Sequence, residues 1–231
     1  IRSLWGQAFC HRQTCASPRI SVTVSPMTNV RPPQLAAKEM ASHLLGGGAA
    51  LLPTDTLPAL AAAPDHAAQI WTLKQRPQDK PLILMASQAD QLLALTSEEA
   101  RDDAEPLVRR FWPGALTLVL PVRNRLSQNL NPGKGTLGMR IPDCDAMRAL
   151  LNESGPLATT SANASGAASS RSAAEAAAAF PGLPLLSPLP WPAPSGLAST
   201  VIAWTSPGCW QVLRQGAVMA DEVETSPPCS G

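Results

Sequence analysis

The sequence predicts a single α/β domain built on an open, mixed parallel and antiparallel sheet with flanking helices. Strand and helix signals alternate through most of the 231 residues, which is typical of an α/β fold. Two pairs of expected strands, in residues 115–141 and 200–213, have no expected helix between their members, which indicates a mixed sheet. The chain is long enough to bury a sizeable core.

The first half of the domain is expected to alternate helix and strand. The expected elements are a helix over 34–45, a strand over 49–52, a helix over 66–74, a strand over 82–85, a helix through Leu95 and a helix through Phe111. Asp65, Ser87 and Thr96 stand where N-caps are expected, because short oxygen-bearing side chains accept hydrogen bonds from free helix N–H groups. Thr96 and Glu99 also have capping-box spacing.

The second half is expected to be richer in strands. The expected elements are strands over 115–122 and 136–141, a helix over 146–151, a strand over 157–160, an alanine-rich helix after Ser172, and strands over 183–186, 200–204 and 210–213. Ser172 and Glu175 again have capping-box spacing. The stretch 187–195 holds four prolines and is interpreted as a loop within the domain.

The ends of the chain differ from its middle. No acidic residue precedes Glu39, and three arginines are spread among Ser, Thr and Pro in residues 1–26. A disordered leader over 1–26 is the favoured interpretation, and a transit peptide is the alternative. The domain is expected over 27–220, with a flexible tail over 221–231.

Composition narrows the class of protein. The net charge of +1 gives no overall basic field, although a local basic site is compatible with it. No apolar run approaches the about 20 residues that span a bilayer, so no membrane association is expected. The five cysteines are odd in number and form no CxxC pair, which favours reduced thiols and a cytoplasmic location. The scattered histidines indicate no metal site.

Two cations stand close together in the stretch LKQRPQDKPL. Lys74 and Arg76 are two residues apart, and Arg76 precedes Pro77, which favours an extended backbone there. In an extended segment such residues point to the same side. An ammonium beside a guanidinium suits a phosphate chain or a carboxylate. Basic residues that simply stabilise the end of a helix are the alternative.

Polar residues also follow two apolar strands. Ser161 and Asn163 come after the strand in PLATTSANASG, and Thr54, Asp55 and Thr56 come after the strand that ends at residue 52. Ligands commonly bind at the ends of strands in open α/β sheets. Ordinary turns are the alternative, with Asp55 shaping an Asx-turn.

Two further arginines lie in strand-like settings, Arg140 in LGMRIP and Arg214 in QVLRQG. A buried arginine without a partner is costly, so each is expected to have an acidic partner or an anionic ligand. A third polar strand end includes Ser199. Neither GxSxG nor HExxH occurs, so no nucleophile–base pair is predicted.

Seven motifs together resemble a known family. PTDT, LKQRPQDKPL, FWPGALTLVLP, GMRIP, ATTSANASG, STV and VLRQGAV occur in the order seen in the YrdC-like family of L-threonylcarbamoyladenylate synthases, over about residues 30–220. The resemblance implies a twisted mixed sheet with a deep, positively charged cavity. It implies synthesis of threonylcarbamoyl-AMP and pyrophosphate from L-threonine, bicarbonate and ATP, with Mg²⁺ bound to the ATP. A partner transferase would then modify the adenosine beside the tRNA anticodon.

The resemblance also implies roles for individual residues. Lys74 and Arg76 are expected to be catalytic, acting on the triphosphate or the developing charge. The expected ATP-binding residues are Lys74, Arg76, Ser161, Asn163 and Arg214, and the expected threonine-binding residues are Thr54, Thr56, Arg140 and Ser199. Arg140 would take the threonine carboxylate, and Ser199 could instead complete the ATP side together with Arg214. No metal-binding side chain is implied.

The sequence departs from the family in two places. PTDT is usually followed by Val-Tyr-Gly-Leu, and here it is followed by Leu57-Pro58-Ala59-Leu60 in a chain without tyrosine. STV is usually followed soon by Asp, and here by Ile202-Ala203-Trp204. The departures motivate a second hypothesis, a non-catalytic module that binds structured RNA weakly through the basic cavity. A carbamoyl-adenylate enzyme like the YrdC-like domain of hydrogenase maturation proteins is a third.

Overall fold

Ten strands form one mixed sheet in the part of the chain that the computed structural model describes, residues 31–223. They are β1 (Gln34–Leu35), β2 (Ala49–Leu52), β3 (Ala59–Ala62), β4 (Ile83–Met85), β5 (Leu116–Pro121), β6 (Thr136–Arg140), β7 (Leu157–Ser161), β8 (Leu185–Leu186), β9 (Thr200–Ser206) and β10 (Cys209–Arg214). The sheet lies within a unit that begins at Pro32. The predicted leader over 1–26 falls outside the described residues.

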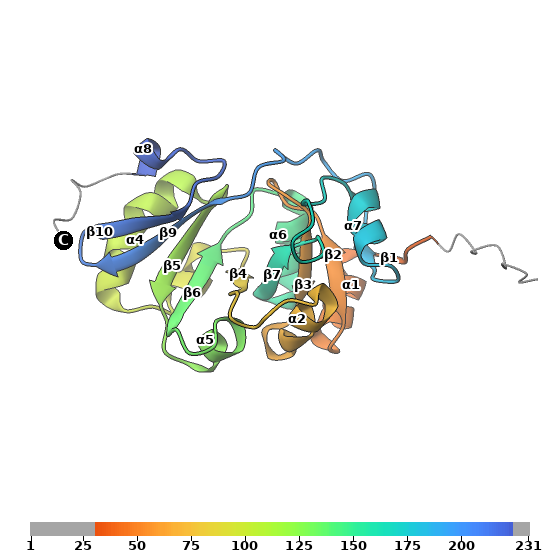
Figure 1. The fold of residues 1–231 in the computed structure, drawn as a ribbon, viewed down its shortest axis with the longest axis horizontal. Coiled ribbons are helices and arrows are strands. Elements are labelled where there is room, and N and C mark those ends of the chain that lie inside the picture. The colour runs from red at the N-terminus through yellow and green to blue at the C-terminus, as the bar shows by residue number, and fades with distance from the viewer. Residues whose placement is uncertain (1–30, 224–231) are drawn as a thin grey trace, which may run out of the picture. The chain divides into compact units, whose positions relative to one another are not determined.

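The order of strands across the sheet is β1-β8-β2-β3-β7-β4-β6-β5-β9-β10 (Figure 1). Neighbours pair antiparallel in β2–β3, β3–β7, β7–β4, β6–β5 and β9–β10, and parallel in β1–β8, β8–β2, β4–β6 and β5–β9. The prediction of an open mixed sheet is therefore confirmed.

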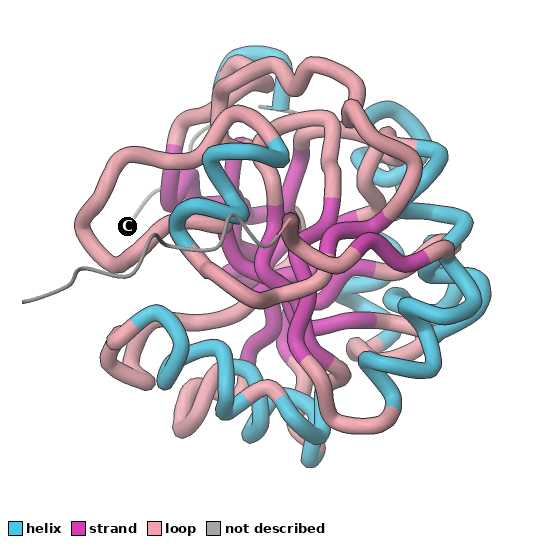
Figure 2. Tube along the Cα trace, turned by 90° about the vertical axis from the view of Figure 1, so that its right-hand side faces the viewer, coloured by secondary structure: helices cyan, strands magenta, loops and turns pink. Residues whose placement is uncertain are grey.

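Helices lie on both sides of the sheet (Figure 2). They are α1 (Ala37–Leu45), α2 (Ala68–Lys74), α3 (Ala89–Leu93), α4 (Glu98–Phe111), α5 (Arg125–Leu130), α6 (Asp145–Ser154), α7 (Ala173–Ala179), α8 (Ala220–Val223) and a 3-10 turn, η1 (Pro64–His66). None of the described helices is long and apolar enough to cross a membrane.

Alternation along the strands divides the core into two layers. Leu51 and Leu60 pack with α2, α4 and α7 on one face, whereas Leu52 and Ala61 pack with α1 and α6 on the other. The α1–α6 layer includes no residue of β5, β6 or β9. Over these three strands that face keeps half-buried side chains, such as Val119. On that face, α1 and α6 therefore do not cover this stretch of the sheet.

Several element predictions were wrong in detail. The helix expected from Gln34 begins at Ala37, because residues 34–35 pair with β8. The strand β3 and the helix α5 were missed, so a helix does separate β5 from β6. The N-caps are Ala67, Gln88 and Ser97 rather than Asp65, Ser87 and Thr96, whereas the cap at Ser172 is confirmed. The shifts are one or two residues, and before α2 the cause is the 3-10 turn η1, which includes Asp65.

The described cysteines differ from each other. Cys144 is a buried free thiol, and burial raises its pKa. Cys209 is disulfide-bonded, so the expectation of reduced thiols throughout was wrong for this residue.

Candidate active site

The end of α2 directs Lys74 and Arg76 toward one strand end. Gln75 adopts a left-handed conformation, with φ of 48°. The Gln75 N–H bonds to the Thr72 carbonyl and the Arg76 N–H to the Trp71 carbonyl, which is the Schellman pattern of helix termination. The two cations therefore converge because the chain reverses at Gln75, and not only because Arg76 precedes a proline.

Both cations bond to the end of β7. The Lys74 ammonium donates to the carbonyl oxygen of Ser161 and, at 3.4 Å, to Oδ1 of Asn163. The Arg76 guanidinium donates to the hydroxyl of Thr160 at 2.9 Å. The Ser161 hydroxyl donates to the same Asn163 oxygen at 2.6 Å. The structure thus brings together Lys74, Arg76, Ser161 and Asn163, which the sequence predicted from two separate motifs.

These cations have no acidic partner. None of the ion pairs in the described part of the chain includes Lys74 or Arg76. Burial, with the charge of Arg76 as a smaller cause, lowers the pKa of Lys74 to about 8. Burial also lowers the pKa of Arg76, against the opposing effect of Asp79, and its buried Nε has no hydrogen-bond partner. An anionic ligand would relieve both conditions.

Thr54 shapes the loop between β2 and β3. Its hydroxyl oxygen accepts the N–H groups of Thr56 and Leu57, both at 3.1 Å, and donates to the Leu57 carbonyl at 2.7 Å. The Asx-turn considered for Asp55 is therefore wrong, because Thr54 supplies the turn oxygen. Thr54 and Thr56 are both buried.

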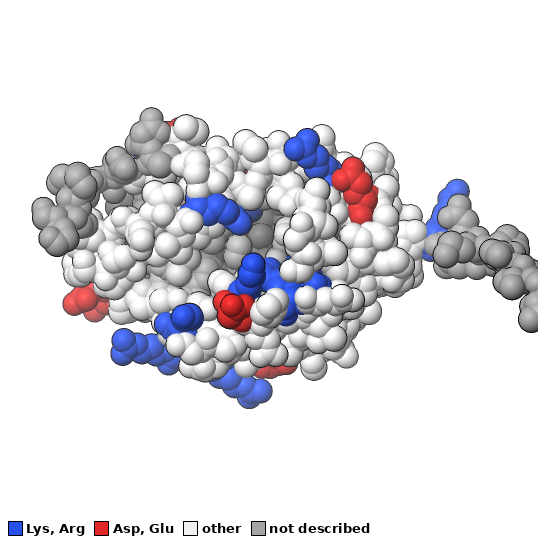
Figure 3. Space-filling model, viewed as in Figure 1, with Lys and Arg blue, Asp and Glu red and all other residues white. Residues whose placement is uncertain are grey.

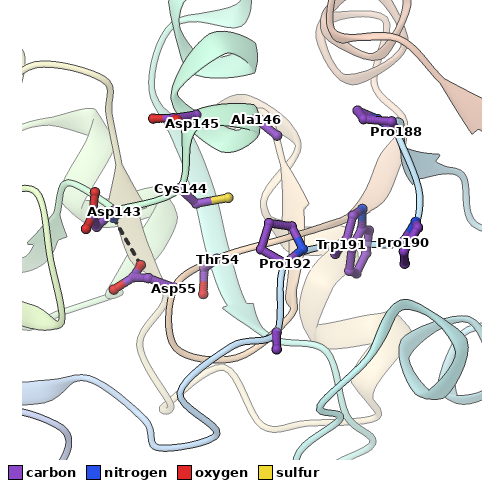
Figure 4. Close-up of a pocket in the computed structure, with 11 residues that line it drawn as sticks. Thr54, Asp55, Asp143, Cys144, Asp145, Ala146, Pro188, Pro190, Trp191 and Pro192 are labelled. Carbon is purple, nitrogen blue, oxygen red and sulfur yellow. Dashed lines mark hydrogen bonds between the residues drawn. The ribbon is translucent and has the colours of Figure 1, made fainter.

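Arg140 lies at the end of β6 in a buried ion pair with Asp55. Its Nη2 is 2.6 and 2.7 Å from the two Asp55 oxygens, Nη1 donates to the Thr56 hydroxyl at 2.8 Å, and Nε donates to the Gly114 carbonyl at 2.8 Å. The Asp143 N–H also donates to Asp55 (Figure 4). The expectation that Arg140 has an acidic partner is confirmed. The side chain of Arg140 is 2% exposed and that of Asp55 18%, so Asp55 is the accessible member.

Arg214 and Ser199 form a neighbouring group. Arg214 donates to the Ser199 carbonyl at 2.8 Å and to its hydroxyl at 3.2 Å. The Ser199 hydroxyl is 2.8 Å from that of Thr117, a residue that sequence reasoning missed. A lone hydroxyl within the apolar run LTLVLP was the available signal. The charge of Arg214 contributes to lowering the pKa of Arg140, mainly caused by burial, so the two cations interact.

Strand register places Ser161 and Arg140 on the same face of the sheet. Ile83 of β4 pairs with Thr159 of β7 and with Gly138 of β6, and paired residues share a face. Ser161 lies two residues beyond Thr159, and Arg140 two beyond Gly138, so both point to this side. Figure 3 shows a hollow near the middle of the molecule with Lys and Arg side chains on two sides of it.

A cavity of about 530 Å³ adjoins the Thr54–Asp55 loop. Its other walls are the start of α6, with Cys144, and the proline-rich loop that carries Trp191 (Figure 4). The residues that line it include none of Lys74, Arg76 or Arg214. Of the four residues predicted to bind threonine, Thr54 lines the cavity, whereas Thr56, Arg140 and Ser199 do not. No group of three or more His, Cys, Asp or Glu that could hold a metal lies among the described residues.

The residues that depart from the family pattern take part in regular backbone pairing and in packing. The Pro58 carbonyl accepts the Ala162 N–H at 2.8 Å, and Ala59 pairs with Ser161. Ile202 is part of the core, and Trp204 donates from its ring nitrogen to Asp103 at 2.7 Å. The replaced positions thus serve packing between strands.

Comparison with known proteins connects this arrangement to a family. The Sua5_yciO_yrdC family model, described as "Telomere recombination", matches residues 42–216. The chain is 39% identical over 150 residues to a protein of Bacillus subtilis named "Threonylcarbamoyl-AMP synthase", covering 63% of this chain and 42% of that protein. It is 35% identical over 190 residues to a protein of the same name from Pyrococcus abyssi, covering 80% and 55%. The chain thus spans about half the length of these two relatives.

A solved structure shows the same fold. It is Sua5 of P. abyssi complexed with L-threonine, with a TM-score of 0.77 and 30% identity. The match covers 84% of this chain and 60% of that one.

Proposed function

This chain belongs to the Sua5_yciO_yrdC family, and from this premise we propose that it is a nucleotidyltransferase that makes L-threonylcarbamoyladenylate from L-threonine, bicarbonate and ATP. The names of the curated relatives and the threonine-bound neighbour support this activity. The same similarity favours the enzyme over the RNA-binding module.

One observation carries the proposal: Lys74 and Arg76, two cations that have no acidic partner among residues 31–223, meet the polar end of β7. In the reaction, the threonine amine condenses with bicarbonate and loses water to form a carbamate. A carbamate oxygen then bonds to the α-phosphorus, and the bond from that phosphorus to the pyrophosphate oxygen breaks. Because the substrate supplies the nucleophile, the protein chiefly has to position the reactants and stabilise negative charge.

The described geometry suggests a division of roles. Lys74 and Arg76 would hold the triphosphate and the charge that develops on it, beside Ser161 and Asn163. Arg214 would extend this ATP side. Thr54, Thr56, Arg140 and Ser199 would form the threonine side. Since Arg140 is already bonded to Asp55, a threonine carboxylate would share the guanidinium rather than claim it alone.

Further parts of the proposal concern partners. We expect Mg²⁺ to arrive with ATP, held by phosphate oxygens and water, and assign no protein ligand to it. A transferase that moves the threonylcarbamoyl group to the adenosine beside the tRNA anticodon, weak RNA binding and a cytoplasmic location all stay predictions.

The proposal is tested with purified protein, ATP, L-threonine and labelled bicarbonate. Label should enter an adenylate only when threonine is present. Equal labelling without threonine would exclude the threonine assignment. Salt-sensitive binding of structured RNA, with no adenylate formed under any condition, would favour the binding module instead.

A further inference from the structure

Asp55 connects its own loop to two segments that are distant in sequence. Its carboxylate accepts from Arg140 at the end of β6 and from the N–H of Asp143, just before α6. Its backbone carbonyl accepts the Ser195 N–H at 2.9 Å, at the end of the proline-rich loop. The side chain of Asp55 therefore contacts the segment before α6, and its backbone contacts the proline-rich loop.

The carboxylate acts on the site through Arg140. Both carboxylate oxygens accept from the same guanidinium nitrogen, Nη2, so the contact holds that nitrogen in place. That guanidinium in turn donates to the Thr56 hydroxyl and to the Gly114 carbonyl. The orientation of the Thr56 hydroxyl thus depends on Asp55, which does not bond to it.

The contact between Asp55 and Arg140 also compensates one of the positive charges of the site. Asp55 compensates Arg140, whereas Lys74 and Arg76 have no carboxylate within ion-pair distance among the described residues. Lys74 and Arg76 therefore form a pair of uncompensated cations to which a phosphate chain would be attracted. The Arg140–Asp55 pair is itself close to neutral, whereas Arg214, whose charge acts on Arg140, has no carboxylate within ion-pair distance in the described part of the chain.

We propose that Asp55 is a positioning residue that defines the amino-acid side of the site. It holds Arg140 and the Thr56 hydroxyl in place, and it compensates the charge of Arg140. The proposal rests on the proposed function for the identity of the amino acid. Its test uses ligand binding, so that it can fail independently of catalysis.

The experiment measures two affinities by calorimetry on the full chain, for L-threonine with a non-hydrolysable ATP analogue present and for inorganic tripolyphosphate alone. In Asp55→Asn the threonine affinity should fall by at least about tenfold, because one partner of a buried charge pair is lost. The tripolyphosphate affinity should stay within about threefold of wild type. Asp55→Glu, which keeps the charge, should recover part of the threonine affinity.

Asp103→Asn is the matched control. Asp103 also accepts N–H bonds from distant residues, Trp204 and Gly208, but away from the site. It should lower the Tm without changing either affinity. If Asp55→Asn does not fold, Asp55→Glu, which displaces the carboxylate but keeps its charge, is judged by the same two affinities.

The outcomes separate the two proposals. Unchanged threonine affinity in a folded Asp55 variant, or equal losses of both affinities, overturns the role of Asp55. Wild-type protein that binds threonine but forms no adenylate overturns the proposed function alone. Wild-type protein that binds no threonine overturns both.

Discussion

The ammonium of Lys74 donates a hydrogen bond to the backbone carbonyl of Ser161, 87 residues further along the chain. This contact joins the end of α2 to the end of β7 and places a buried cation beside the Ser161 and Asn163 side chains. A lysine held in this way is preorganised, because its position is set before any substrate binds.

Removing the Lys74 ammonium should weaken catalysis strongly. Lys74→Ala is expected to cost about 2–4 kcal/mol of transition-state stabilisation, comparable to losing one preorganised donor. The measurement is kcat/KM for pyrophosphate release. Lys38→Ala, at an exposed position on α1, is the matched control and should retain wild-type activity. Full activity in Lys74→Ala would show that Lys74 is not part of the active site.

Phosphate binding should depend on pH through Lys74. Burial lowers the pKa of Lys74 to about 8, so its charge is present below that pH and is lost as the pH rises through it. Tripolyphosphate affinity of the free protein should therefore fall between about pH 7 and 9. Lys74→Arg keeps its charge in this range and should flatten the profile. An unchanged slope in that variant would assign the titration to another group.

The lowered pKa of Lys74 also affects the free energy of unfolding, which should rise with pH where phosphate affinity falls. Between pH 8 and 10.5 the native state binds fewer protons at Lys74 than the unfolded state does. The contribution of Lys74 to the free energy of unfolding should thus rise with pH across this window. Denaturant unfolding of wild type and Lys74→Met at several pH values isolates that contribution by difference.

The left-handed backbone conformation of Gln75, in the turn after α2, should lower the free energy of unfolding. Its φ of 48° is unfavourable for most residues but not for glycine. Gln75→Gly should leave the protein as stable or raise the free energy of unfolding by up to about 1 kcal/mol, whereas Gln75→Val should lower it by more than that. Urea denaturation checks both values, and activity should fall in Gln75→Val because Lys74 and Arg76 flank the turn.

Removing Arg140 from its buried ion pair with Asp55 should destabilise the protein. Arg140→Met leaves the Asp55 carboxylate uncompensated, and we expect a loss of about 3–5 kcal/mol of stability. Combining it with Asp55→Asn should restore part of that loss, because neither variant side chain is charged. Additive losses in the double variant would show that the pair does not interact energetically.

Local patterns predicted most of the helices and strands. Apolar runs bounded by Gly, Pro or capping residues located eight of the strands and most of the helices near their observed bounds. β3 was missed because Ala59–Ala62 is apolar on both faces and has neither alternation nor β-branched residues. The order of the strands could not be derived, since pairs such as Leu51 with Leu185 join distant parts of the chain.

The site was predictable where two residues of one segment act together. The i, i+2 spacing identified Lys74 with Arg76 and Ser161 with Asn163. Sequence alone could not show that the Asp55 carboxylate binds Arg140, because 85 residues separate the two. It also could not show that the Thr54 and Thr56 hydroxyls are used within the loop, which depends on backbone conformation.

The central claim is tested most directly by pyrophosphate release from ATP, measured with and without L-threonine at saturating bicarbonate. The account predicts release that requires threonine and that falls sharply in the Lys74→Ala variant. Release at the same rate without threonine, or undiminished in Lys74→Ala, would contradict it.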